Sequence, residues 1–150
     1  MFILRKDRGP IPEILTQILD SCVNGVTLAD PDLPDSPIVY ANKAFEKITG
    51  YATQDIVGRN CRFLQGADRD QPALAELRAA IAAHEPFEGT LRNYRKNGEP
   101  FSNRLSITPL FGPDGGVIYY LGVQYDVTEQ VAAQDEIARL GARLKDLEQA

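Results

Sequence analysis

The nine residues GRNCRFLQG (58–66) place one cysteine, Cys61, in the middle of a short polar stretch. A buried free cysteine is most often a small apolar residue of the core. Cys61 differs because its neighbours in the sequence are polar or charged: Asn60, Arg62 and Gln65. A thiol in such surroundings can be reactive. The other cysteine, Cys22, ends an apolar helical stripe, and for it we keep the interpretation as a small core residue.

The residues before this motif predict a helix, two strands and a second helix. Apolar side chains recur at helical spacing over about 11–22, which predicts a short amphipathic helix. The segments GVTLAD (25–30) and PIVYAN (37–42) predict strands, and the proline- and aspartate-rich residues between them predict a turn. Asn42 is expected to cap a short helix over 42–49.

The residues after the motif predict a longer helix and three longer strands. Residues 53–66 are expected to hold short helical pieces, and a helix is expected over about 71–83. Three strands follow, linked by turns at Asn97-Gly98 and Pro113–Gly116, and they are expected at about 86–96, 100–110 and 116–127. Two strands, then helices, then three strands indicate an α+β domain, not an alternating βαβ one. We expect a five-stranded antiparallel sheet with helices on one face and a ligand cavity between the two layers.

The pattern changes again after Thr128. Four apolar residues recur at spacings of three, four and three, which is typical of a coiled-coil seam: Ile137, Leu140, Leu144 and Leu147. An isolated helix of this length is marginal, so the seam must pack on the domain's own sheet or on a second copy of the chain. We therefore expect three parts: an N-terminal cap helix region (1–22), a core (23–128) and a C-terminal helix (129–150).

Composition excludes several classes of function. The net charge of −5 argues against nucleic acid as a partner, because phosphate binding needs a basic face. No run of 18 apolar residues and no signal peptide is present, so we expect a cytoplasmic protein without a membrane partner. Two separated cysteines and one histidine, His84, do not have the spacing of a metal site.

The motif GRNCRFLQG resembles the signature of the LOV (light-oxygen-voltage) family, a light-sensing branch of the PAS domains. The resemblance covers about residues 23–128 and includes ADPDLPDSPIVYANKAFEKITGY (29–51), LRNYRKNGEPFSNRLSITP (91–109) and YLGVQYDVT (120–128). It implies a PAS fold, bound flavin mononucleotide (FMN) and a blue-light photoreceptor that is not an enzyme. Cys61 is then the photoactive nucleophile: in the family, the thiol bonds to flavin carbon 4a under blue light, nitrogen N5 gains a proton, and the bond breaks in the dark.

The resemblance also implies which residues bind the cofactor. Side-chain amides carry a donor and an acceptor in fixed geometry, as the edge of the flavin ring requires. The matching amides are Asn60, Gln65, Asn93, Asn103 and Gln124. The positions that match the lining of the ring are Thr27, Ile38, Phe63, Leu64, Leu77, Leu91 and Leu105.

Arginines are expected at the flavin phosphate, because the guanidinium fork suits a dianion. Arg62 and Arg78 match the two phosphate arginines of the family, and Arg69 matches a further one found in some bacterial members. Another arginine that such members can carry is absent, since Leu74 stands in its place. From the residues alone, these arginines fit a solvated mixed-charge surface as well as an anion site.

Gln124 is expected to pass the signal onward. It lies on the last predicted strand, shortly before the C-terminal helix. When flavin N5 changes from acceptor to donor, the glutamine amide can rotate and rearrange the hydrogen bonds of that strand. The chain is similar to the bacterial short LOV proteins, which have only the core and its flanking helices. We therefore expect a homodimer through the flanking helices and a downstream partner that the sequence does not name.

Two other classes of function stay open on the residues. One is a PAS scaffold that dimerises through its end helices and binds no light-active flavin, but it leaves the amides and arginines unexplained. The other is a flavin oxidoreductase that uses Cys61 as a redox thiol. The chain lacks a plausible second redox cysteine, a GxGxxG motif and a proton-relay histidine, which such an enzyme would need.

Overall fold

The structure is a computed structural model, and it describes residues 13–149. Ile11, the first apolar residue of the expected N-terminal helix, lies outside the described residues, as does Ala150. The elements in chain order are α1 (Glu13–Asp20), β1 (Gly25–Ala29), β2 (Ile38–Ala41), α2 (Lys43–Thr49), α3 (Thr53–Ile56), the 3-10 helix η1 (Cys61–Gln65), α4 (Pro72–Ala82), β3 (Phe87–Tyr94), β4 (Pro100–Phe111), β5 (Val117–Asp126) and α5 (Thr128–Glu148).

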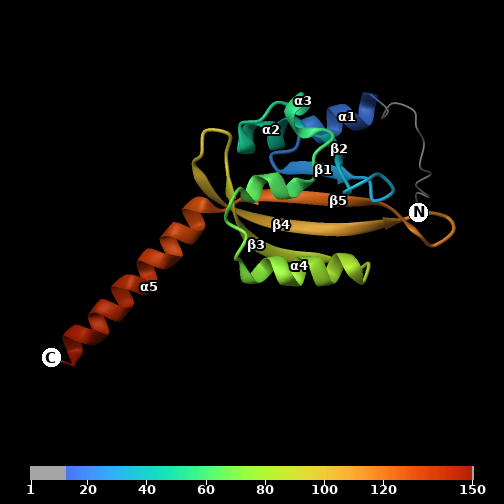
Figure 1. Cartoon of the computed structure of the whole chain (residues 1–150). Coiled ribbons are helices and arrows are strands. Elements are labelled where there is room, and N and C mark those ends of the chain that lie inside the picture. Colours follow the sequence, from blue (N-terminus) through green and yellow to red (C-terminus); the bar gives the residue numbers. More distant parts are fainter. Residues whose placement is uncertain (1–12, 150) are drawn as a thin grey trace.

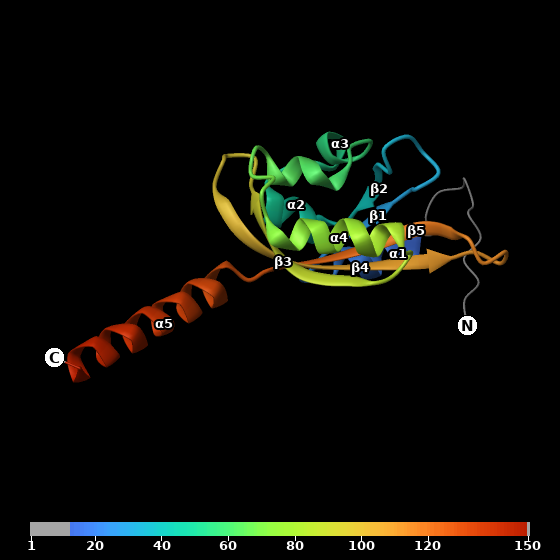
Figure 2. The same cartoon turned by 60° about the horizontal axis from the view of Figure 1, so that its bottom comes forward.

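The five strands form one sheet in the order β2-β1-β5-β4-β3, and every neighbouring pair is antiparallel. Helices α2, α3 and α4 lie over one face of this sheet (Figures 1 and 2). Side chains on β4 alternate, so that Phe101, Asn103 and Leu105 are buried under the helices. The predicted α+β PAS architecture is confirmed.

The β3–β4 hairpin turns at residues 95–99, as the Asn97-Gly98 pair predicts. The Asn97 side chain accepts a hydrogen bond from the backbone N–H of Glu99 at 2.9 Å. Gly98 has φ +87°, a left-handed conformation that favours glycine. This turn fixes the register that places Leu91 opposite Asn103.

Two apolar clusters lie between the helices and the sheet. One is formed by α2, α3, β2 and η1 and contains Ile38, Ala41, Phe45, Ile56 and Leu64. The other joins α4 to β3 and β4 and contains Leu74, Phe87, Leu91 and Leu105. Cys61 packs against the first cluster and Leu77 against the second. The space between the two clusters is where a ligand cavity forms.

Asn42 connects the start of α2 to β1 and to the end of α1. Its side chain is fully buried, and its oxygen accepts from the N–H of Phe45 at 3.1 Å and of Val26 at 2.8 Å. Its amide nitrogen donates to the carbonyls of Leu19 at 2.8 Å and Asn24 at 3.0 Å. The predicted N-cap is confirmed, and the same side chain also anchors two other segments.

The base of α5 is fixed to the sheet by polar contacts. Val127 donates its N–H to the carbonyl of Ser102 at 2.9 Å, and Ser102 donates to Thr128 Oγ1 at 3.0 Å. Asp126 accepts from the N–H of Thr128 at 3.1 Å and from Arg95 at 2.7 Å. The direction in which α5 leaves the domain is therefore set by the β3–β4 turn, β4 and the end of β5.

Beyond this base, α5 extends away from the sheet (Figure 1), and no residue of it is buried. Its apolar seam is exposed to 70%, 45%, 61% and 65% at Ile137, Leu140, Leu144 and Leu147. The structure thus does not show the seam packed on the domain's own sheet, which was one of the two expected ways to cover it.

One expectation for the N-terminal region is wrong. Cys22 is exposed, not a core residue, because α1 ends at Asp20 and turns Cys22 outward; its thiol contacts the carbonyl of Ile18 at 3.4 Å. Ile14 and Ile18 are exposed as well. Within residues 13–149, no helix is long and apolar enough to cross a lipid bilayer. The same part of the chain holds no cluster of side chains suited to a metal ion.

We predict that Asn42→Ala lowers the free energy of unfolding by about 2–4 kcal/mol, because it removes a helix cap and leaves buried backbone groups without partners. Urea unfolding followed by circular dichroism measures this change. Asn97→Ala is the control, since Asn97 caps only an exposed turn. Equal losses for the two variants would contradict the anchoring role of Asn42.

Candidate functional site

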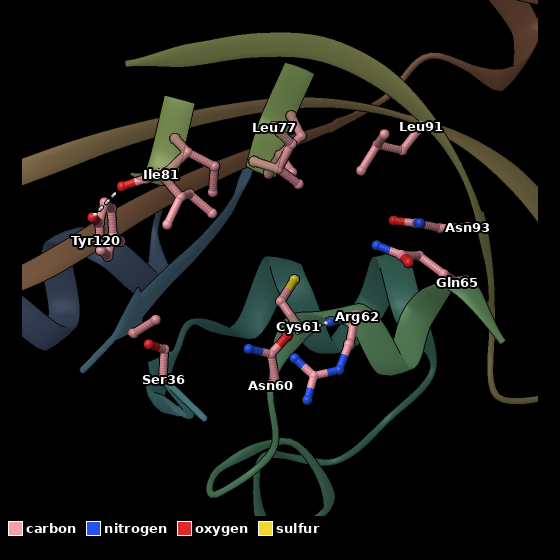
Figure 3. A pocket seen from close by; sticks show the side chains of 13 residues that line it. Ser36, Asn60, Cys61, Arg62, Gln65, Leu77, Ile81, Leu91, Asn93 and Tyr120 are labelled. Atoms are coloured by element: carbon pink, nitrogen blue, oxygen red, sulfur yellow. Dashed lines mark hydrogen bonds between the residues drawn. The ribbon is translucent and has the colours of Figure 1, made fainter. Parts of the chain in front are cut away.

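A cavity of about 190 Å³ lies between the sheet, α4 and the η1 segment (Figure 3). One wall comes from η1 and the residue before it, another from α4, and the floor from the inward-facing residues of the strands. Its lining consists of Ala29, Ser36, Asn60, Cys61, Arg62, Gln65, Leu77, Ile81, Leu91, Asn93, Leu105, Ile107 and Tyr120.

Cys61 is the first residue of η1, and its sulfur points into the cavity (Figure 3). Asn60 holds this start of the helix, because its side-chain oxygen accepts from the N–H of Arg62 at 3.0 Å. Burial raises the pKa of the Cys61 thiol to about 11. The group is therefore a neutral thiol near pH 7. It lacks the lowered pKa of cysteines that attack substrates unaided.

Buried amides gather where β3 and β4 meet the cavity. Gln65 and Asn93 line it, and Asn103 lies on the neighbouring strand. Asn103 donates its side-chain N–H to Asn93 Oδ1 at 2.9 Å, and Asn93 donates to the carbonyl of Arg92 at 3.0 Å. Asn103 Oδ1 is buried and has no hydrogen-bond partner among the described residues. Within this amide pair, both nitrogens and the Asn93 oxygen take part in hydrogen bonds, whereas the Asn103 oxygen does not.

Gln124 is a second buried amide with an unused oxygen. Its nitrogen donates to Thr27 Oγ1 at 3.3 Å, while Oε1 has no partner in the described part of the chain. Two glycines make room for this side chain. A Cβ on Gly122 would lie 2.5 Å from Thr27 Oγ1 and 3.0 Å from Gln124 Nε2, and one on Gly25 would lie 3.3 Å from Gln124 Oε1.

A polar network holds the segment before α4 against β3. Asp68 accepts from Arg92 at 2.7 and 2.8 Å and from the hydroxyl of Tyr94 at 2.8 Å. The hydrogen bonds from Arg92, and then that from Tyr94, lower the pKa of Asp68 to about 2. Because the folded-state pKa is lowered, the ionised carboxylate stabilises the fold above its ordinary pKa, and this contribution is lost as the pH falls towards 2. Gln71 Oε1 also accepts a part-buried hydrogen bond from the N–H of Arg92 at 2.7 Å.

The three arginines expected at a phosphate do not all reach the cavity. Arg62 lines it and forms an ion pair with Asp35. Arg69 is exposed and donates to the carbonyl of Gly66 at 3.2 Å. Arg78 is exposed on α4 and does not line the cavity. Of the three arginines, Arg62 alone lines the cavity.

The other expected site residues divide in the same way. Those that line the cavity are Asn60, Cys61, Gln65, Leu77, Leu91, Asn93 and Leu105. Those that lie behind the lining, in the sheet or in the first apolar cluster, are Thr27, Ile38, Phe63, Leu64, Asn103 and Gln124. Leu64 is 1% exposed and packs with Ile38 and Phe45.

Five lining residues were not expected from the sequence: Ala29, Ser36, Ile81, Ile107 and Tyr120. Spacing could have identified three of them. Ile107 and Tyr120 lie two and four residues from Leu105 and Gln124 on their strands, and Ile81 lies one helical turn after Leu77. Ser36 lies in an irregular loop, where no periodicity applies. Tyr120 donates its hydroxyl to the carbonyl of Ile81 at 3.3 Å and closes one end of the cavity (Figure 3).

Comparison with known proteins agrees with this geometry. Residues 23–129 match the PAS domain family. The chain is 50% identical over 107 residues to blue-light-activated histidine kinase 1 of Erythrobacter litoralis, a match that covers 71% of this chain and 30% of the kinase. Among solved structures it is similar to an RNA-binding light-oxygen-voltage receptor, with a TM-score of 0.81, 39% identity, and coverage of 88% of this chain and 37% of that one.

It is also similar to the LOV domain of the Erythrobacter litoralis EL346 blue-light-activated histidine kinase, with a TM-score of 0.66 and 44% identity. That match covers 70% of this chain and 96% of the solved domain. The chain therefore belongs to the PAS domain family and, within it, to the LOV domains of blue-light photoreceptors. It spans less than a third of the length of the histidine kinase that it matches.

We predict that Gly122→Ala destabilises the domain by about 1–3 kcal/mol, because the added methyl group must displace Thr27 or Gln124. Thermal unfolding measures the effect. Gly141→Ala is the matched control, since nothing lies within 4 Å of a Cβ there and alanine favours a helix by up to about 1 kcal/mol. Unchanged stability in Gly122→Ala would show that the packing around Gln124 is loose.

Proposed function

We propose that this chain is a blue-light sensor that binds FMN in the cavity and bonds it reversibly through the Cys61 sulfur to ring carbon 4a, with the thiol proton passing to N5. The position of Cys61 carries this proposal. Its sulfur faces the cavity from η1, opposite the strands that hold the buried amides. Cys61 and Gln65 thus line the cavity from η1 and Asn93 lines it from β3, while Asn103 and Gln124 lie in the sheet behind this lining.

The buried amides support a flavin as the ligand. A buried oxygen without a hydrogen bond costs about 1–3 kcal/mol, and both Asn103 Oδ1 and Gln124 Oε1 are in this state. An oxidised flavin ring offers one N–H donor, at N3, which would satisfy one of these two oxygens. For the acceptors of the ring, Gln65 offers its amide at the cavity wall, and the Asn93 nitrogen has a second hydrogen besides the one it donates to Arg92. The edge of a flavin ring carries both kinds of group, so the residues fit it.

The neutral thiol supports a reaction that needs light. Burial holds the pKa of Cys61 at about 11, and the sulfur packs beside an apolar cluster. It is therefore a poor nucleophile in the ground state. A bound flavin supplies the light absorption and the excited ring that can accept the sulfur. What the chain contributes is the position of Cys61 at the wall of the cavity.

The rival functions have less support. A redox enzyme would need Cys61 as a thiolate or paired with a second thiol. The pKa of Cys61 is raised, and Cys22 is exposed at the end of α1 and does not line the cavity. A scaffold without a cofactor would leave two buried amide oxygens unsatisfied. We therefore propose a sensor and not an enzyme.

Gln124 is proposed as the first residue of the output path. It lies on β5, opposite Leu105 of β4, and β5 continues to Asp126 at the base of α5. Its amide can rotate because the oxygen is held by no partner in the described chain and the nitrogen only by a 3.3 Å bond. Rotation would change the hydrogen bonding of β5 next to the polar contacts that hold α5.

The exposed seam of α5 supports a homodimer. Four large apolar side chains are solvent-facing, and burying each of them is worth roughly 1.5–3 kcal/mol. A second copy of the chain offers the same seam, and the exposed residues Ile14 and Ile18 of α1 could extend the interface. We do not assign the kinase or RNA-binding activity of these relatives to this chain, and we name no downstream partner for it.

We predict that the purified protein carries FMN and loses its blue absorption band reversibly on illumination. Cys61→Ala should keep the flavin, because amides and arginine hold it, but should not bleach and should fluoresce steadily. Absorption and fluorescence spectra under blue light measure both effects. Cys22→Ala is the control and should behave as the wild type. Bleaching of Cys61→Ala would assign the reaction to another residue, and a colourless protein that does not bind added FMN would refute the proposal.

We predict that Leu140→Glu or Leu144→Glu weakens the dimer at least tenfold, since a charge replaces a side chain of the seam. Sedimentation or light scattering over a concentration series measures the change, while the bleaching of the flavin persists. Ala142→Glu is the control, because it introduces the same charge on the opposite face of α5. A wild-type monomer at all concentrations would refute the homodimer.

A further inference from the structure

The loop between β1 and β2 lies over the cavity beside the η1 segment. Asp35 and Ser36 both adopt left-handed backbone conformations, with φ +69° and +46°. Ser36 lines the cavity, and the carbonyl of Asp35 accepts from the side-chain N–H of Asn60 at 2.7 Å. The loop is thus attached to the residue that caps the helix of Cys61.

The carboxylate of this loop engages the guanidinium of Arg62, a residue that lines the cavity. Arg62 donates to Asp35 in an ion pair in which both side chains are about half exposed, 45% for Arg62 and 59% for Asp35. This hydrogen bond holds the pKa of the Asp35 carboxyl below its usual value, so Asp35 is ionised near pH 7. Of the three arginines expected at a phosphate, the one that lines the cavity is therefore already paired with an anion.

We propose that Asp35 competes with the cofactor phosphate for Arg62 and so determines how strongly the site prefers FMN over riboflavin. The inference rests on the proposed flavin function. A guanidinium has a limited number of N–H donors, so each one given to Asp35 is lost to the phosphate. The carboxylate also lies within hydrogen-bond distance of the guanidinium, where its charge repels a dianion that binds there.

Because the ion pair is exposed to solvent, Asp35 weakens phosphate binding to Arg62 but does not prevent it. Ion pairs between exposed side chains are weak and are screened by salt, whereas a phosphate dianion offers a guanidinium two charge-assisted bonds. The cofactor can therefore displace Asp35 from Arg62, at reduced affinity. The loop is free to stay in place, because its backbone bond to Asn60 does not involve the carboxylate.

Asp35→Asn is the informative variant. Asparagine adopts left-handed backbone conformations as readily as aspartate, so φ +69° is preserved while the charge is removed. Asp55→Asn is the matched control. It removes the same charge from an exposed residue whose pair, with Lys96 at 3.7 Å, lies outside the cavity lining.

The experiment measures binding of FMN and of riboflavin to flavin-free protein by quenching of flavin fluorescence, at low and at high salt. We expect Asp35→Asn to bind FMN about two- to fivefold more tightly than wild type at low salt, with a smaller gain at high salt. Riboflavin affinity should not change, and Asp55→Asn should match the wild type for both ligands. In an Arg62→Ala background, Asp35→Asn should give no gain beyond that of Asp55→Asn.

Four results would overturn the inference. Weaker FMN binding by Asp35→Asn would show that Asp35 orients Arg62 towards the phosphate. An equal change for riboflavin would show that the variant acts through the loop and not through the phosphate. A gain that persists in the Arg62→Ala background would remove Arg62 from the explanation. Failure of every variant to bind FMN would refute the proposed function itself, whereas FMN binding that is indifferent to Asp35 refutes only this inference.

Discussion

Buried amide groups impose the constraint on which the rest of the domain depends. Asn93, Asn103 and Gln124 lie on the covered face of three adjacent strands, where water cannot complete their hydrogen bonds. They partly satisfy one another and Thr27, and two oxygens are left over. A core built only for stability would use apolar side chains at these positions. The domain instead keeps these polar groups in the sheet, and glycines, a hairpin turn and the Asp68–Arg92 network hold the elements around them.

Cys61 lies among the polar lining residues Asn60, Arg62 and Gln65. Across the cavity it faces a mostly apolar sheet surface that includes Leu91, Leu105 and Ile107. The surroundings that raise its pKa also protect the thiol from adventitious ionisation and oxidation. The polar neighbours of Cys61 in the sequence have structural roles. Asn60 caps η1, and Arg62 forms an ion pair with Asp35. A neutral thiol that reacts only after its ligand has absorbed light suits a sensor that must give no signal in the dark.

The sequence predicted regular features well because they follow local rules. Strand alternation, the Asn97-Gly98 turn and the Asn42 cap each depend on a few neighbouring residues, and all three are present in the structure. The residues that line the cavity were harder to predict from the sequence. They depend on the register of the strands and on whether a helix packs over each side chain. Leu64 belongs to a core cluster although its neighbour Gln65 lines the cavity. Cys22 was placed in the core because an apolar stripe does not reveal where its helix ends. The Asp35–Arg62 pair joins residues 27 positions apart, and no local pattern indicates it.

The length and rigid attachment of α5 have a mechanical consequence. Its 21 residues form a rod of about 31 Å that begins at contacts with β4 and touches nothing else in the described domain along its outer turns. A tilt of about 10° at this base would displace the far end by about 5 Å, roughly the pitch of one helical turn. Movements at the sheet that are too small to disturb the core are therefore multiplied with distance along the rod. Whatever the far end contacts experiences a shift comparable to the spacing between successive seam residues.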